Sequence, residues 1–289
     1  MAADVLKTSL LDLWDAIGPA ANRILLGGGY GLYLKQQHLA QAGESTLIPI
    51  DLWPVPRVTQ DLDLFLTTEI VADVKSMGAI REALDSLNYR VIDESKYLQF
   101  VREISETQVV KIDLLTTQLD ELKDTAGIKA DDRRARPTAK DRPNLHADPT
   151  DGALGLTESA LTLEVTGELT SGTAANTMVR IPHPFSYLLM KLTAYRDRKE
   201  DPSKELGQHH ALDIFRIAAM LTQHELAEVI ERVDEYESNP QVSSCREVAR
   251  SDFADATASG VLGMRRHDLW QDDAPLETFL GVISDIFNR

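Results

Sequence analysis

The stretch that decides the fold reads Arg57-Val-Thr-Gln-Asp-Leu-Asp-Leu-Phe-Leu66. From Thr59 onward, polar and apolar residues alternate, which is typical of a strand with one face in a core. Because successive side chains of a strand point to opposite faces, Asp61 and Asp63 share one face and the leucines occupy the other. Two carboxylates so close repel each other unless a cation such as Mg²⁺ binds both. The stretch therefore predicts a divalent-metal site on the surface of a sheet.

A second stretch repeats the pattern and reads Val109-Val-Lys-Ile-Asp-Leu-Leu115. Its even-numbered residues would face the core and Asp113 the other side. If the two strands are neighbours, Asp113 joins Asp61 and Asp63 as a third carboxylate, and we expect it to act as a general base as well. Three carboxylates that hold Mg²⁺ or Mn²⁺ are what metal-assisted phosphoryl or nucleotidyl transfer requires. A solvated strand end is the plain alternative.

Upstream lies a glycine-rich run, Leu25-Leu-Gly-Gly-Gly-Tyr-Gly-Leu-Tyr-Leu34. It is not a phosphate-binding P-loop, since no Gly-Lys-Ser/Thr follows, and leucines stand where a dinucleotide motif needs its third glycine. What remains is a tight turn that opens a helix and presents backbone N–H groups, a suitable place for a phosphate. An ordinary structural turn is the alternative.

The order of the elements predicts an α+β protein in two parts. The pattern indicates an N-terminal helix, a strand pair around residues 97–115 and further strands at 161–169 and 177–181, hence a mixed sheet with helices over 1–180. The charged, proline-rich stretch 129–151 predicts a mobile loop or linker. After Pro182 the pattern is almost wholly helical. We therefore expect a core over 1–180 and a helical domain over 181–289 that completes the active-site cleft.

Composition narrows the class of function. The 289 residues carry a net charge of -16 at pH 7, the wrong sign for a protein that holds nucleic acid over a wide surface. Basic residues nevertheless concentrate at 129–142, at 196–204 and at Arg265-Arg266, so a local track for an RNA end is compatible with the sequence. We expect no signal peptide and no membrane span, and the single cysteine, Cys245, excludes internal disulfides. These features predict a cytoplasmic protein with no membrane partner.

Together, the glycine turn before a helix, the Arg-x-Thr-x-Asp-Leu-Asp motif and the later strand with one aspartate resemble the nucleotidyltransferase superfamily. In detail they resemble its AbiEii-type toxin branch, which includes the MenT nucleotidyltransferases. The likeness continues in Leu189-Met-Lys-Leu-Thr-Ala-Tyr-Arg-Asp-Arg-Lys199 and Ala211-Leu-Asp-Ile-Phe215, and it covers residues 25 to about 221. It implies an enzyme that moves a nucleotidyl group from an NTP to an acceptor hydroxyl, with a tRNA 3′ end as acceptor and a cognate antitoxin as partner.

By position, the resemblance implies roles for single residues. Asp61 and Asp63 become metal ligands, Lys191 the cation on the phosphates, and Asp213 the carboxylate that positions Lys191 or the nucleotide. The predicted nucleotide-binding set consists of Gly28, Gly29, Arg57, Thr59, Lys191, Tyr195 and Arg198. Part of this set has its own support, because Tyr187, Lys191, Tyr195 and Arg198 recur at helical spacing, and we expect a basic, aromatic face away from the apolar side.

Other interpretations stay open. An enzyme of the same fold that modifies a small hydroxylated molecule such as an antibiotic would suit the acidic composition, since cationic acceptors are drawn to it. A catalytically degenerate member would act as a binding module. His209 and His210, just before Asp213, have a spacing that could bind a metal, and His267-Asp268 is similar to a pair found in metal-dependent phosphohydrolases. For these histidines we expect no ligand role.

Overall fold

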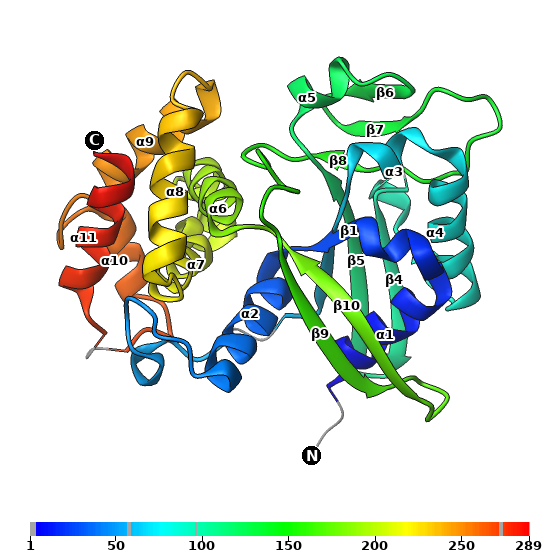
Figure 1. Ribbon diagram of the computed structural model, residues 1–289, viewed down its shortest axis with the longest axis horizontal. Coiled ribbons are helices and arrows are strands. Elements are labelled where there is room, and N and C mark those ends of the chain that lie inside the picture. The colour runs from blue at the N-terminus through cyan, green and yellow to red at the C-terminus, as the bar shows by residue number, and fades with distance from the viewer. Residues whose placement is uncertain (1–3, 57–58, 96, 272–273, 289) are drawn as a thin grey trace. The chain divides into compact units, whose positions relative to one another are not determined.

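The computed structural model describes residues 4–56, 59–95, 97–271 and 274–288, which form two compact units (Figure 1). The first unit comprises Met1–Leu32, Val58–Thr150 and Gly155–His183, and the second comprises Tyr33–Arg57, Asp151–Leu154 and Pro184–Arg289. We predicted the consecutive parts 1–180 and 181–289. The structure instead groups residues 33–57 and 151–154 with those from 184 onward.

A mixed sheet forms the centre of the first unit, in the strand order β3-β4-β5-β2-β1-β10-β9 within the described residues, with β8 also paired to β5. The pairs β2–β5, β1–β10 and β5–β8 are parallel, and the others are antiparallel. The strands are β1 (Ile24–Leu26), β2 (Asp61–Leu66), β3 (Arg90–Val91), β4 (Gln99–Ser105), β5 (Gln108–Thr116), β8 (Asp148–Pro149), β9 (Leu161–Glu168) and β10 (Ala174–Ile181). This arrangement, with the helices described below, confirms the predicted α+β class.

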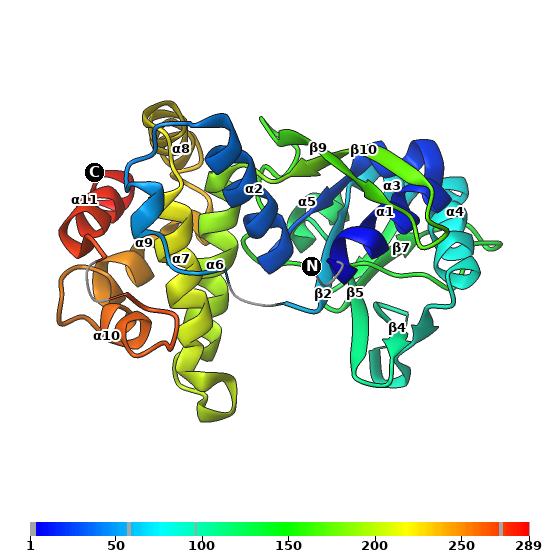
Figure 2. The ribbon, with the colours of Figure 1, turned by 90° about the horizontal axis from the view of Figure 1, so that it is seen from below.

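Helices cover one face of this sheet. α1 packs on α4 and on β9, and Figure 2 shows α1 and α4 together. Leu62, Leu64 and Ile112 are fully buried, whereas the odd-numbered residues of β2 up to Asp63 and of β5 from Lys111 to Leu115 are only partly covered. The even-numbered face is therefore the core face, as the alternation in the sequence predicted. The helical segments are α1 (Val5–Ile17), η1 (Gly18–Arg23), α3 (Thr68–Ala72), α4 (Val74–Ser86), η3 (Asp93–Ser95) and α5 (Leu119–Lys123).

The loop predicted over 129–151 is wrong. A hairpin of β6 (Ile128–Asp131) and β7 (Arg134–Pro137) occupies its first part, and β8 lies near its end. The hairpin packs on α3 and α5 (Figure 1). Its strands were missed because each is only four residues long and part of the burial that stabilises them comes from α3, which is distant in sequence.

The second unit is helical, as predicted for the C-terminal part. α6 is its central helix, with α7, α8 and α9 packed against it. Segment 33–57 belongs here because Leu47 N–H donates to Leu221 O at 2.8 Å and Lys35 Nζ lies 2.5 Å from Glu225 Oε1. The helices are α6 (Pro184–Arg198), η4 (Pro202–Gly207), α7 (Gln208–Ala219), α8 (Gln223–Glu235), α9 (Pro240–Asp252), α10 (Ser259–Arg265) and α11 (Leu276–Phe287), preceded by α2 (Gly28–Ala42), which both units share, and by η2 (Ile50–Leu52).

Among the helices of the described chain, none combines the length and the apolar character that a membrane span needs. Cys245 is buried, and burial raises the pKa of its thiol to about 11.

Candidate functional site

Three aspartates lie on one face of the β2–β5 pair. The strands are parallel, with Asp63 in register with Asp113 and Asp61 in register with Lys111. Residues in register on neighbouring strands share a face, so these four side chains lie on the face opposite the core. The strands are neighbours, as the prediction for Asp113 required. That Asp61, Asp63 and Asp113 bind a metal ion stays a prediction.

Lys111 changes the charge of this face. Its Nζ lies 3.0 Å from Asp113 Oδ1 and 3.1 Å from Oδ2, and the hydrogen bond goes to Oδ2. Asp113 Oδ1 is buried and accepts no hydrogen bond from the described residues. A buried carboxylate oxygen in that state has capacity for a further ligand. Lys111 thus offsets one of the three negative charges without using all of the acceptors of Asp113.

The glycine turn lies directly against Asp63. Gly27 N–H donates to the backbone oxygen of Asp63 at 2.8 Å. Gly28 has a φ of +60°, and a Cβ placed there would lie only 1.6 Å from Asp63 Oδ2. Glycine is required at 28 both by the backbone conformation and by the contact. The turn that starts α2 and the Asp-x-Asp strand are therefore parts of one site.

The remaining residues of the motif have simpler places. Thr59 Oγ1 accepts a hydrogen bond from Asp61 N–H at 3.2 Å, which holds the start of β2. Gly29 is in the first turn of α2. Arg57, which we predicted to contact the nucleotide, lies outside the described residues.

The carboxylates of Asp61, Asp63 and Asp113 are suited to a divalent cation that is held in part by a substrate. Within the described ranges, no three His, Cys, Asp or Glu side chains come close enough together to hold a metal ion. Mg²⁺ commonly takes only one or two protein carboxylates and completes its shell with substrate phosphates and water. Hard oxygen donors on one sheet face, with unused capacity at Asp113 Oδ1, match that mode rather than an all-protein cage.

A second polar cluster is buried in the helical unit. Lys191 Nζ lies 2.7 Å from Asp213 Oδ2, and Arg216 Nη1 lies 3.2 Å from Asp213 Oδ1. Arg216 also donates to Gln36 Oε1 at 3.2 Å, while its buried Nε makes no hydrogen bond within the described chain. All three charged residues are at most 9 % exposed. Two cations on one carboxylate leave a net positive charge, and burying it is costly unless an anion binds.

The sequence paired Lys191 with Asp213 but missed Arg216. The available signal was its position three residues after Asp213, which puts both side chains on one side of α7.

The predicted open face of α6 is wrong for its tyrosines. Tyr187 and Tyr195 are 1 % and 2 % exposed. The Tyr195 ring packs edge-on against Phe253, with ring centroids 5.1 Å apart, and its hydroxyl lies 3.5 Å from Ser259 Oγ. Arg198 donates to Ala194 O of its own helix at 3.3 Å. The cause is that α6 is surrounded by other helices, so a helix face that looked polar in the sequence lies in the interior.

Two of the three histidines singled out in the sequence, His209 and His267, contact one another. His209 Nδ1 and His267 Nε2 are 2.6 Å apart, and His209 Nε2 lies 2.6 Å from Glu205 Oε2. In the part of the chain that the structure describes, no group of three metal-binding side chains forms around these histidines either.

Comparison of the chain with protein-family models, with curated proteins and with solved structures gave no match.

Proposed function

We propose that this chain is a metal-dependent nucleotidyltransferase with the nucleotidyltransferase fold, which moves an NMP from an NTP to an acceptor hydroxyl. The observation that carries the proposal is the shared face of Asp61, Asp63 and Asp113, with the glycine turn in contact with Asp63. Carboxylates beside a phosphate-binding turn are what this reaction needs.

The proposed reaction is an in-line displacement. The acceptor oxygen attacks the α-phosphorus, the bond from that phosphorus to the bridging oxygen breaks, and pyrophosphate leaves with the electron pair. Asp113 takes the proton of the hydroxyl, and Lys111 holds its carboxylate in place. Mg²⁺ or Mn²⁺ held by Asp61 and Asp63, with substrate phosphates as its other ligands, would neutralise the triphosphate and lower the pKa of the attacking hydroxyl.

Phosphate binding is assigned to two places, each within its own unit. Backbone N–H groups at the start of α2, at Gly28 and Gly29, would donate to phosphate oxygens. The buried cluster of Lys191, Asp213 and Arg216 carries excess positive charge, which supports a contact with an anionic group. In this assignment Asp213 is a positioning residue, because it orients both cations.

The resemblance to AbiEii-type toxins supports a tRNA 3′ end as the acceptor and a toxin–antitoxin pair as the setting. A specific observation favours a second candidate, transfer onto a cationic small molecule. A cavity of about 510 Å³ in the first unit is lined by four carboxylates and two arginines. Its excess of carboxylates would attract amino groups. The charged lining residues are Glu94, Asp131, Asp132, Arg133, Arg134 and Asp148.

The test uses Asp61→Asn and Asp63→Asn, with Asp120→Asn as the matched control because the Asp120 side chain is 85 % exposed. Labelled NTPs are incubated with the full chain and either bulk tRNA or aminoglycosides. We expect labelled tRNA, a loss of at least ~100-fold in both site variants and none in the control.

Full activity in either site variant would remove the mechanism. Label on the aminoglycoside alone would establish the second candidate. Failure of the wild-type chain to bind Mg-NTP in calorimetry would identify a degenerate binding module.

A further inference from the structure

Basic side chains form a row on one face of the β6–β7 hairpin. Lys129 is the cross-strand partner of Arg136, and Asp131 is the partner of Arg134. Partners and second neighbours on paired strands share a face, so Lys129, Arg134 and Arg136 lie on the same side. Ala135, between the two arginines, is completely buried on the other side. We call Lys129, Arg134, Arg136 and nearby Arg142 the basic row.

The basic row is electrostatically unfavourable by itself. Like charges directly opposite each other, as at Lys129 and Arg136, destabilise a strand pair. The pKa of Arg136 lies below its usual value, because the group is partly desolvated and because Arg142 and Arg134 are close to it. The ion pair between Arg134 Nε and Asp131 Oδ2, at 3.5 Å, offsets one of these charges. Such a concentration of cations, in a chain of net charge -16, fits a bound polyanion.

The sheet register relates β8 to the aspartate face. β8 runs parallel to β5 with Asp148 in register with Leu115. Leu115 is two residues beyond Asp113 and faces the same side, so Asp148 does too. Ala147, the preceding residue, then faces the core side, and it is completely buried.

A bridge between β7 and the residue before β8 relates the hairpin to the same face. Ala147 is bridged to Ala135 of β7, which is also on the core side. Arg134 and Arg136 flank Ala135, so they face the side that carries Asp148 and the three aspartates. From the strand spacings, the basic row lies on the order of 15 Å from Asp113.

A cavity gives independent support for this placement. Arg134 and Asp148 both line the cavity of about 510 Å³, so the two residues border the same space. The carboxylates of its lining would repel a phosphate but would accept hydrogen bonds from the amino groups of a base. Phosphates therefore belong on the basic row and a base in the cavity beside it.

We propose that the basic row binds the phosphodiester backbone of a single-stranded nucleic acid on the aspartate side of the sheet. Its identification as the acceptor strand rests on the proposed function; the binding itself does not. A nucleic-acid backbone and the triphosphate of an NTP both present phosphate groups. The basic row suits the nucleic acid better, because its four cations are spread along β6, β7 and the following loop rather than gathered around one point.

The experiment measures binding of a fluorescent, roughly 12-nucleotide single-stranded RNA to the full chain over a salt series. The variants are Arg136→Gln and the triple change Arg134→Gln, Arg136→Gln and Arg142→Gln. The matched control is Arg90→Gln, an exposed arginine of the same unit that pairs with Glu103. We expect the triple variant to lower the slope of log affinity against log salt by about 2, from three contacts of ~0.7 each. The Arg90 variant should keep the wild-type slope.

Thermal unfolding of each variant separates loss of binding from loss of fold. Because the removal of like charges offsets the loss of the exposed Arg134–Asp131 ion pair, we expect the stability of the triple variant to change by less than about 1 kcal/mol. A wild-type salt slope in the triple variant, or an equal change in the Arg90 variant, would overturn the proposal. Loss of affinity for NTP without loss of RNA binding would show a triphosphate site instead and would overturn it as well.

The proposal and the proposed function fail separately. Asp61→Asn and Asp63→Asn should abolish transfer yet bind RNA with the wild-type salt slope. If RNA binding depends on the basic row but the chain transfers no nucleotide, only the proposed enzymatic function is rejected. If nucleotide transfer to RNA and RNA binding are unchanged in the triple variant, only the proposed role of the basic row is rejected.

Discussion

At the scale of single residues, the contact between Gly28 and Asp63 is the most demanding feature of the candidate site. A side chain at residue 28 is unfavourable for two reasons: the backbone has a positive φ, and an ideally placed Cβ would lie 1.6 Å from Asp63 Oδ2. We expect Gly28→Ala to lower the free energy of unfolding by about 2–3 kcal/mol and to abolish nucleotide transfer, because Asp63 must move. Denaturant unfolding and the transfer assay measure the two effects.

Gly172→Ala is the control for the backbone alone. Gly172 has a φ of +82°, and an added Cβ would meet nothing within 4 Å. Its loss should be limited to about 1 kcal/mol, with transfer unchanged. Equal losses in the two variants would mean that the contact with Asp63 does not matter.

The sequence predicted the aspartates of this site better than their surroundings. The two-residue alternation was sufficient to put Asp61, Asp63 and Asp113 on one face, because that period is a local property of a strand. It could not show that Gly28 touches Asp63 or that Arg216 joins Lys191, since both contacts depend on how separate segments pack.

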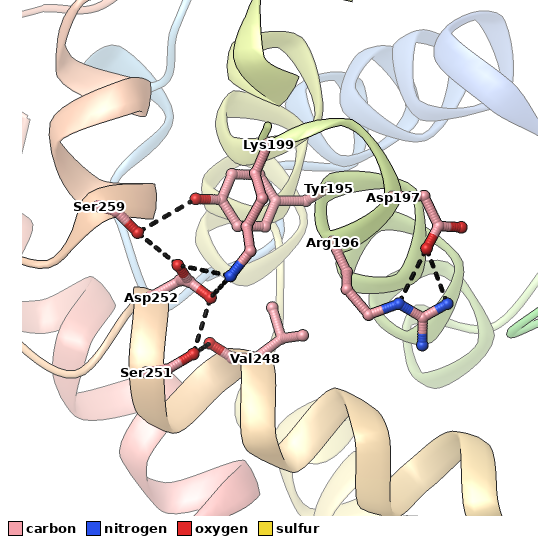
Figure 3. A network of polar contacts seen from close by, with 8 residues as sticks. All are labelled: Tyr195, Arg196, Asp197, Lys199, Val248, Ser251, Asp252 and Ser259. Atoms are coloured by element: carbon pink, nitrogen blue, oxygen red, sulfur yellow. Dashed lines mark hydrogen bonds and ion pairs between the residues drawn. The ribbon is translucent and has the colours of Figure 1, made fainter. Parts of the chain in front are cut away.

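At the scale of elements, the carboxylate of Asp252 connects α9 with α10 and with Lys199, the residue that follows α6 (Figure 3). It accepts hydrogen bonds from Lys199 Nζ at 2.9 and 3.2 Å, from Ser251 Oγ at 2.7 Å and from Ser259 Oγ. Burial works to raise the pKa of Asp252, but the bonds from Ser259, Lys199 and Ser251 outweigh it, and the pKa lies below its usual value. The charged carboxylate is therefore what stabilises the fold here.

We expect Asp252→Asn to cost about 3 kcal/mol at neutral pH, since Lys199 loses its partner. A folded-state pKa below the unfolded value means that the contribution is complete above the unfolded value and is lost as the pH falls through the folded one. The variant should therefore lose less stability than the wild type between about pH 5 and pH 2. Urea unfolding over this range measures the difference.

Asp85→Asn provides the comparison, because Asp85 forms an ion pair with Arg81 and its side chain is 52 % exposed. That change should cost less than about 1 kcal/mol. An Asp252 variant as stable as the Asp85 variant would show that the network is not needed.

Elements also show where sequence patterns fail. The helices after residue 182 were predicted because their apolar stripes are regular. The β6–β7 hairpin was not, since Arg134-Ala-Arg-Pro137 has no run of strand-forming residues and is stabilised by packing on α3. The tyrosines of α6 were misplaced for a related reason, because polar spacing on one helix does not reveal that other helices surround it.

At the scale of the whole molecule, the net charge of -16 at pH 7 makes opposite predictions for stability and for binding. Self-repulsion of the folded chain is screened by salt, so added KCl should raise the thermal midpoint, by about 2–4 °C for each ~1 kcal/mol of repulsion removed. The same salt should weaken RNA binding, because counterions compete at the basic row.

The control is the same KCl series measured at a lower pH. Near pH 4.8, the isoelectric point of the sequence, the net charge is close to zero and the salt effect on the thermal midpoint should vanish. A midpoint that falls with KCl at pH 7 would show that attractive ion pairs outweigh the net repulsion. A rise of equal size at both pH values would mean that the salt acts through hydrophobic burial rather than through charge. If the rise disappears at the isoelectric point, the salt effect at pH 7 comes from the net negative charge of the chain. The four cations of the basic row then form a local region of opposite charge, which a bound nucleic-acid strand would explain.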